Sequence, residues 1–128
     1  MVPNEIQSLV DITQQIKIRD ITKYAGICRA IEEMQKQIGA ISADKHRQII
    51  CGADLHSFAK WQRWSDTEIE KLRTKIQETA NEKEAARKLA ANSQAKVQVL
   101  ELLLKKARSE QIQKARRRAE QDGRPPDA

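Results

Sequence analysis

Residues 69–107 read IEKLRTKIQETANEKEAARKLAANSQAKVQVLELLLKKA, and this stretch decides the fold of the chain. One set of mainly apolar or small side chains recurs in it at alternating intervals of three and four residues. Its members are Ile69, Leu72, Ile76, Thr79, Lys83, Ala86, Ala90, Ser93, Val97, Leu100, Leu104 and Ala107. This spacing is typical of the seam of a coiled coil, which a second helix must cover.

The first half of the chain carries a matching seam. Its members are Tyr24, Ile27, Ile31, Met34, Ile38 and Ile41, again at alternating intervals of three and four. Upstream, we expect Leu9, Ile12 and Ile16 to continue it. Two successive steps of four through Asp20 then join Ile16 to Tyr24, and such a stutter locally unwinds a coiled coil.

The break between the two seams is predicted at residues 51–54. Gly52 suits the left-handed position that ends a helix, and Asp54 suits the N-cap of the next helix. The prediction is an all-α fold, a long antiparallel two-helix coiled-coil hairpin within one domain over residues 1–121. Its first arm spans about residues 5–50 and its second about residues 55–120. A less favoured break lies at residues 39–44, and residues 122–128 are expected to be disordered.

The two arms differ in length, so the longer second arm should project beyond the first. The overhang is expected to comprise about 20 residues and to begin near Lys105. The small and polar side chains between Thr79 and Ser93 predict a loose middle of the hairpin, or a place where another helix packs. The pairs Glu84/Lys88 and Glu101/Lys105 have the spacing of stabilising helix ion pairs.

The composition excludes several classes of protein. Only 3 % of the 128 residues are aromatic and 33 % are charged, which does not fit a β-sandwich or barrel. No apolar run approaches the roughly 18–20 residues that span a bilayer, and the N-terminus lacks the pattern of a secretory signal. Cys28 and Cys51 are expected to be reduced thiols, and the expected location is the cytoplasm.

The net charge of +6 lies mostly at the end of the second arm. The first 54 residues hold equal numbers of acidic and basic side chains. The basic residues of the overhang are Lys105, Lys106, Arg108, Lys114, Arg116, Arg117 and Arg118. They form either a solvated helix end, favoured by the helix dipole, or a surface that docks into an acidic partner. No aromatic residue follows Trp64, so single-stranded nucleic acid is a poor candidate.

An aromatic cluster follows the predicted turn. Phe58, Trp61 and Trp64 step by three along a helix with Leu55. The series either plugs the closed end of the hairpin or forms a contact for a partner. Residues that step by three drift around a helix, so we expect Trp64 to be partly exposed.

Residue patterns of catalysis are missing from the sequence. His46, Cys51 and His56 are spaced by five, which does not converge on one side of a helix, so no zinc site is expected. No phosphate-binding loop or catalytic triad is visible. The sequence therefore predicts a protein without enzymatic activity, cofactor or metal.

The layout resembles the flagellar and type III secretion stalk proteins, the FliJ/YscO family. Trp61-Gln62-Arg63-Trp64 is similar to an aromatic-Gln-x-aromatic element that follows the hairpin loop in that family. A polar helix then leads to an apolar step like residues 100–103, Leu-Glu-Leu-Leu. Gly52 falls where the Gly-bearing loop of the family lies. The Ala-rich middle of this chain departs from the family pattern.

The resemblance implies a function in flagellar protein export, and hence in motility, or in type III secretion. Family stalks place one end in the central hole of the export ATPase hexamer, contact the export gate at the membrane, and in some members handle export chaperones. The ring would then receive residues 6–16 together with the basic residues 105–118. The gate-side contact would be Phe58, Trp61 and Trp64, and the protein would be peripheral at the inner membrane.

Two readings of other classes remain open. One is a basic coiled coil that binds nucleic acid or the ribosome through its C-terminal cations. The other is a homodimeric structural coiled coil, in which the seams pair between chains.

Overall fold

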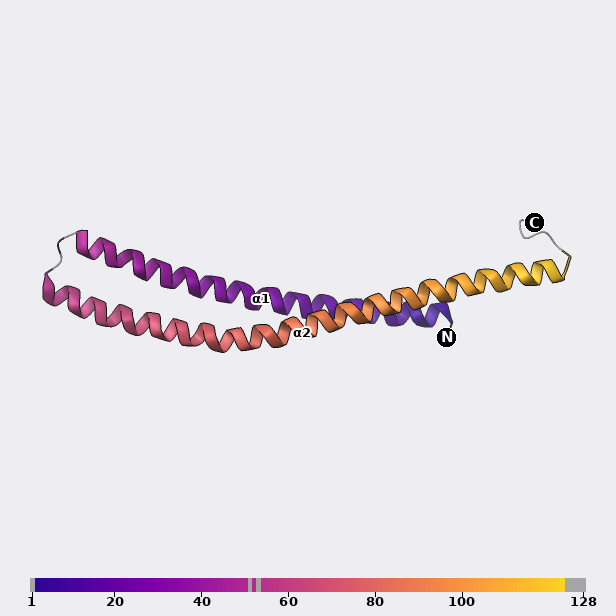
Figure 1. Cartoon of the computed structure of the whole chain (residues 1–128), viewed down its shortest axis with the longest axis horizontal. Helices are drawn as coiled ribbons and strands as arrows, with labels where there is room; N and C mark the ends of the chain where they lie inside the picture. The colour runs from indigo at the N-terminus through magenta and orange to yellow at the C-terminus, as the bar shows by residue number, and fades with distance from the viewer. Residues whose placement is uncertain (1, 51, 53, 124–128) are drawn as a thin grey trace. The chain divides into compact units, whose positions relative to one another are not determined.

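The computed structural model describes residues 2–50, 52 and 54–123. It consists of two helices, α1 from Pro3 to Ile50 and α2 from Leu55 to Gln121, joined by a short turn (Figure 1). The two helices pack antiparallel as a helical hairpin, which confirms the predicted fold class. Within their described parts, no 18-residue window is apolar enough to cross a bilayer.

The ends of the helices follow from local chemistry. Gly52 has a φ of 68°, a left-handed conformation that side-chain-bearing residues avoid, and it follows the end of α1. Asp54 caps α2, because the Ser57 amide donates to its Oδ1 at 2.8 Å and the Ser57 hydroxyl donates to its Oδ2 at 3.1 Å. The alternative break at residues 39–44 is wrong, since α1 is continuous there. No proline stands at these positions to end the helix.

The C-terminal end of α2 is a hydrogen-bonded turn. The amide of Asp122 donates to the carbonyl of Arg118 at 3.0 Å, and that of Gly123 donates to the carbonyl of Glu120 at 3.1 Å. Gly123 has a φ of 70°, so it occupies the position where glycine commonly ends a helix. Residues 124–128 of the tail expected to be disordered lie outside the described part of the chain.

The hairpin divides into two compact units. The first unit combines the start of α1, up to Asp20, with α2 from Leu89 onward. The second unit combines the rest of α1, from Ile21, with α2 up to Lys88. Each unit is thus a pair of antiparallel helical segments with its own seam.

The seam of the first unit is built around Ile6, Val10 and Leu104. These three side chains form a buried cluster, against which Leu100 and Ala107 pack. Val97, farther along the same stripe of α2, is only 2 % exposed. Burial of such side chains removes apolar area from water and is the main source of stability in a two-helix unit.

The α1 side of this seam corrects the sequence-based prediction. Leu9, Ile12 and Ile16 are exposed, so they do not continue the seam. The buried or half-buried stripe of α1 is instead Ile6, Val10, Thr13, Lys17 and Asp20. These positions alternate by four and three and run in phase into Tyr24, so α1 has no stutter. The helix keeps its register with α2 at the cost of placing polar side chains in the seam.

In the second unit, every predicted seam position is buried or half-buried. Ile31 and Ala86 are the buried apolar residues of this unit. Within the stretch predicted to be loose, Ala86 here and Ser93 in the first unit are among the most buried side chains, whereas Thr79, Lys83 and Ala90 are half-buried. Small side chains let two helix backbones approach closely, so little space remains to be filled.

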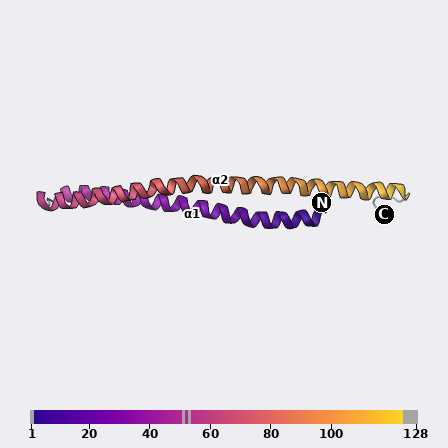
Figure 2. The same ribbon diagram turned by 90° about the horizontal axis from the view of Figure 1, so that it is seen from below.

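The projecting part of α2 is shorter than predicted. Arg108 donates a hydrogen bond to Gln7 of α1, and a surface pocket lined by both helices reaches Pro3 and Lys114. The overhang therefore begins only near Lys114. Both views show α2 extending past the start of α1 (Figures 1 and 2). The prediction derived the overhang from the lengths of the two arms alone, which does not take account of how the side chains of the two helices pair in this unit.

The side-chain pairs on the helix surface also differ from the prediction. Glu84 pairs with Arg87, whose Nη2 lies 2.7 Å from Glu84 Oε1, rather than with Lys88. Glu101 accepts a hydrogen bond from Gln14 of α1 at 3.0 Å. The planar guanidinium of Arg87 donates from two separate nitrogens, Nε and Nη2, to the two oxygens of the Glu84 carboxylate, a geometry that the single nitrogen of a lysine does not offer.

Candidate functional site

The end of α2 concentrates exposed cations. The side chains of Lys114, Arg116, Arg117 and Arg118 are all exposed. The seam positions that follow Ala107 are Gln111, Lys114 and Arg118, so the seam carries no apolar side chain beyond Ala107. Because this end offers no apolar side chain at a seam position, it presents positive charge around the helix. Such a surface is suited to an acidic partner.

The other predicted basic residues have different surroundings. Lys105, Lys106 and Arg108 are exposed but belong to the part of α2 that lies beside α1. Arg108 Nη2 donates to Gln7 Oε1 at 3.1 Å, so its guanidinium helps to hold the two helices together. The seven cations predicted as one projecting surface therefore separate into three beside α1, Lys114 at the start of the overhang, and three arginines that project.

The aromatic cluster lies in the second unit, at the start of α2. Phe58 and Trp61 are half-buried and their rings stack, with centroids 6.2 Å apart and planes at 26°. Trp64 is 54 % exposed, which confirms the expected exposure of this ring. Leu55, the first member of the series, is 87 % exposed. The first turns of α2 thus present apolar and indole surface to solvent.

A buried polar pair interrupts the seam of the first unit, and the sequence did not reveal it. The hydroxyl of Ser93 on α2 donates to Oδ2 of Asp20 on α1, and both residues are buried. Arg19 Nε lies 3.4 Å from Asp20 Oδ1, with its own side chain 74 % exposed. Buried polar groups at seam positions of coiled coils fix the register of the helices. The Asp20–Ser93 hydrogen bond therefore serves to fix the register of the two helices in this unit.

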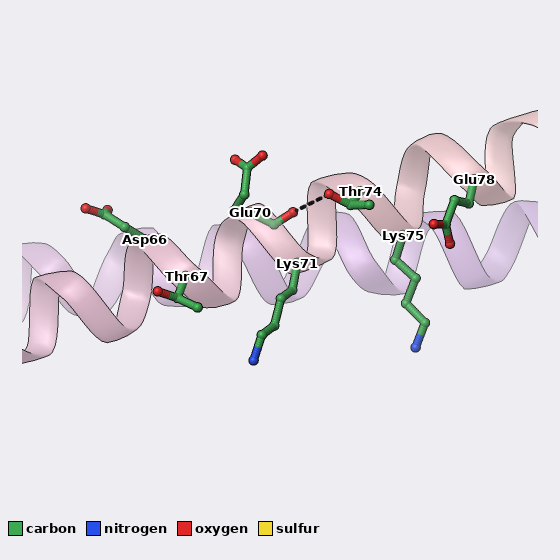
Figure 3. Close-up of a pocket in the computed structure, with 7 residues that line it drawn as sticks. All are labelled: Asp66, Thr67, Glu70, Lys71, Thr74, Lys75 and Glu78. Atoms are coloured by element: carbon green, nitrogen blue, oxygen red, sulfur yellow. Dashed lines mark hydrogen bonds between the residues drawn. The ribbon is translucent and has the colours of Figure 1, made fainter.

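A shallow surface pocket lies along α2 in the second unit. All seven residues that line it come from this one helix: Asp66, Thr67, Glu70, Lys71, Thr74, Lys75 and Glu78 (Figure 3). Lys71 and Lys75 point to one side of the helix, whereas Asp66 and Glu70 point to the other. The only bond drawn among them joins the Thr74 hydroxyl to the Glu70 carbonyl. These side chains do not converge on a common point, so the pocket offers no constellation for acid–base chemistry.

Metal-ligating residues do not gather in the described part of the chain. Among residues 2–50, 52 and 54–123, no group of three or more His, Cys, Asp or Glu is placed to hold a metal ion. Cys28 is a half-buried free thiol. Cys51 lies outside the described residues, so the arrangement of His46, Cys51 and His56 is not described.

The shifted pKa values belong to surface hydrogen bonds. The amide and hydroxyl of Ser57 hold the pKa of Asp54 below its ordinary value of 3.8. The hydrogen bond from Arg87 lowers the pKa of Glu84, and the same pair raises the pKa of Arg87. All three groups lie at the protein surface, so these shifts describe a helix cap and a surface ion pair.

Comparison with known proteins adds no family assignment. No protein-family model, no curated protein and no solved structure matches the chain.

Proposed function

We propose that the chain is a non-enzymatic stalk component of a flagellar or type III protein export apparatus. In this role its basic helix end would bind the export ATPase ring from the cytoplasmic side. The observation that carries the proposal is the exposed cationic end of α2, with Lys114, Arg116, Arg117 and Arg118 beyond the paired part of the first unit. The resemblance of residues 61–64 and 100–103 to the export stalk family supports it further.

The interaction with the ring would be electrostatic. Four exposed cations on a projecting helix raise the local concentration of an acidic partner and speed its association. Because the cations are solvated, their contribution falls as salt increases. The start of α1, which lies beside Arg108, would enter the ring together with this end.

The test is a titration of the full chain into the purified export ATPase of the same cell, with ATP turnover and hexamer formation as readouts. We expect a saturable rise in turnover that weakens at higher salt. The triple variant R116Q/R117Q/R118Q should lose most of the effect. A variant with the same change in net charge, K71Q/R73Q/K75Q, replaces exposed cations of the second unit and should retain it.

Absence of any effect on turnover at low salt, with a helical and soluble chain, would refute the proposed function. Equal loss in both triple variants would show that net charge alone is responsible.

A second contact is proposed for the export gate, a membrane protein, through the aromatic start of α2. The exposed indole of Trp64 beside the stacked Phe58 and Trp61 has the character of an interface hot spot. A folded W61A/W64A variant should lose affinity for the gate while still stimulating the ATPase. Undiminished gate affinity would remove this contact from the proposal, and export chaperones would be tested as partners in the same way.

The two alternative functions give different results in simple assays. A basic coiled coil that binds nucleic acid would shift random duplex DNA, with an affinity that falls steeply with salt. A homodimeric coiled coil would show twice the monomer mass in solution. The stalk function requires neither result.

A further inference from the structure

The two sides of the first unit differ in chemistry. On one side, residues that directly follow seam residues bridge the helices. Gln14 donates to Glu101 at 3.0 Å, and Arg108 donates to Gln7 at 3.1 Å. Each of these four side chains stands one position after a half-buried or buried seam residue. This side of the helix pair is therefore closed by polar contacts.

The opposite side is apolar and open. Besides Leu89 (51 % exposed), which lies at the end of the unit, five large apolar residues stand one position before a seam residue, which places them together on the other side of the antiparallel pair. They are Leu9 (40 % exposed), Ile12 (57 %), Ile16 (39 %), Val99 (56 %) and Leu103 (47 %). We call these five residues the apolar stripe. Two shallow pockets lie along it, one reaching from Ile6 to Leu103 and one from Thr13 to Val99.

This pattern is that of a helix bundle rather than of a two-stranded coiled coil. Two helices that need only each other carry apolar residues at the seam positions alone. Helices that face the core of a larger bundle carry an additional apolar position beside the seam. The first unit has this additional position on both helices, mainly on one side, since only Ile18 and Ile112 stand one position after a seam residue on the other side. This side can therefore accommodate one more helix.

The charges beside the apolar stripe indicate what that element carries. Along α2, Lys96 and Lys106 stand one position before seam residues, so they flank the stripe on its α2 edge, and Glu110 follows one turn beyond Lys106. They are ten positions apart, about 15 Å along the helix. An amphipathic helix with acidic residues at that spacing along one edge of its apolar face would match both lysines.

A second copy of this chain matches the stripe less well. A twofold axis perpendicular to the helices would pack α2 of one copy antiparallel to α2 of the other. It would set Lys96 of one copy against Lys106 of the other. A twofold axis parallel to the helices would pack α2 of one copy beside α1 of the other. It would set Lys96 against Arg19, which also precedes a seam residue. The first arrangement opposes like charges, and the second combines one like pair with one opposite pair, Lys106 and Glu5, so self-association gains little from charge in either.

We propose that the apolar stripe of the first unit is a docking site for one amphipathic helix of a partner protein, with acidic residues along the edge that meets Lys96 and Lys106. The bound helix would complete a three-helix bundle. It would bury the five stripe residues while the polar side of the unit stays in solvent. This site is distinct from the cations at Arg116, Arg117 and Arg118, on which the proposed function rests.

The test uses a designed peptide of about six helical turns, with leucines on one face and glutamates ten positions apart on one edge. Its control is a peptide of the same composition with the glutamates moved to the opposite edge. Fluorescence anisotropy of the labelled peptide with the full chain should show saturable binding. The control peptide should bind at least about tenfold more weakly.

Variants of the chain identify the site. I12S/V99S removes two exposed residues of the stripe without touching the seam, and should weaken peptide binding about tenfold or more. I18S/L102S removes two residues of equal or greater exposure that do not belong to the stripe, and should leave affinity unchanged within about twofold. Circular dichroism of both variants checks that the helices persist.

Three results would overturn the proposal. They are the absence of saturable binding, equal affinity for both peptides, and equal loss in both double variants. A dimer mass for the free chain that I12S/V99S converts to a monomer would also overturn it, because the occupant would then be a second copy. The ATPase titration does not involve this peptide, so failure of either test leaves the other interpretable.

Discussion

Removal of the Ser93 hydroxyl should destabilise the hairpin strongly for so small a change. We expect Ser93→Ala to lower the free energy of unfolding by about 1.5–3 kcal/mol, the range for a hydrogen bond to a charged group. The Asp20 side chain that accepts this bond is only 9 % exposed, so water replaces the lost donor poorly. Arg19 does not compensate, because its exposed guanidinium lies 3.4 Å away and is screened by solvent.

The measurement is urea unfolding followed by far-UV circular dichroism, at several protein concentrations. A double-mutant cycle with Asp20→Ala isolates the pair, and we expect a coupling free energy between about 0.5 and 3 kcal/mol. Ser109→Ala is the control, because Ser109 is an exposed serine of the same helix. Its effect should stay within about 0.5 kcal/mol.

Replacement of both Asp20 and Ser93 tests whether the cost of Ser93→Ala comes from leaving the buried carboxylate without its donor. The variant D20L/S93A exchanges the buried polar pair for apolar side chains, so no buried charge is left without its donor. It should be as stable as the wild type or more stable. The reasoning would be refuted if Ser93→Ala matched the Ser109→Ala control, or if the cycle showed no coupling between Asp20 and Ser93.

Further predictions concern the core, the helix cap and the aromatic cluster. Leu104→Ala should cost about 2–3 kcal/mol in urea unfolding because it empties the buried cluster of the first unit, whereas Leu102→Ala, at an exposed position, should cost little. Asp54→Ala should speed hydrogen exchange in the first turn of α2. The folded-state pKa of Asp54 is lowered, so its cap should stabilise the helix fully above pH 3.8 and be lost as pH falls through that lowered pKa. Acrylamide should quench the fluorescence of W61F, which retains only the exposed Trp64, more strongly than that of W64F.

The fold of this chain was accessible from its sequence because the heptad pattern is a local signal. The second seam, from Ile69 to Ala107, proved buried or half-buried at every position. The helix ends were accessible for the same reason, since Gly52 and Asp54 act through their own backbone and their nearest neighbours. Trp64 was expected to be exposed from the angular drift of its spacing alone.

The errors arose where one helix had to be matched to the other. Leu9, Ile12 and Ile16 are more hydrophobic than Thr13, Lys17 and Asp20, so hydropathy alone selects the wrong stripe. The correct stripe follows from the demand for an unbroken register with α2, in which Asp20 accepts a hydrogen bond from Ser93. The start of the overhang depends on the same register. Such a pairing is a property of two segments together, and neither segment reveals it alone.

The cationic end of α2 has a consequence for the energetics of binding. Its seam positions Gln111, Lys114 and Arg118 carry no apolar side chain, so the last turns are helical chiefly because the helix propagates into them from the packed region. Helicity at this end should therefore decrease on warming before the hairpin itself unfolds. A partner that binds the helical form must then supply the ordering free energy, so its affinity should weaken on warming more steeply than contacts to a rigid surface would.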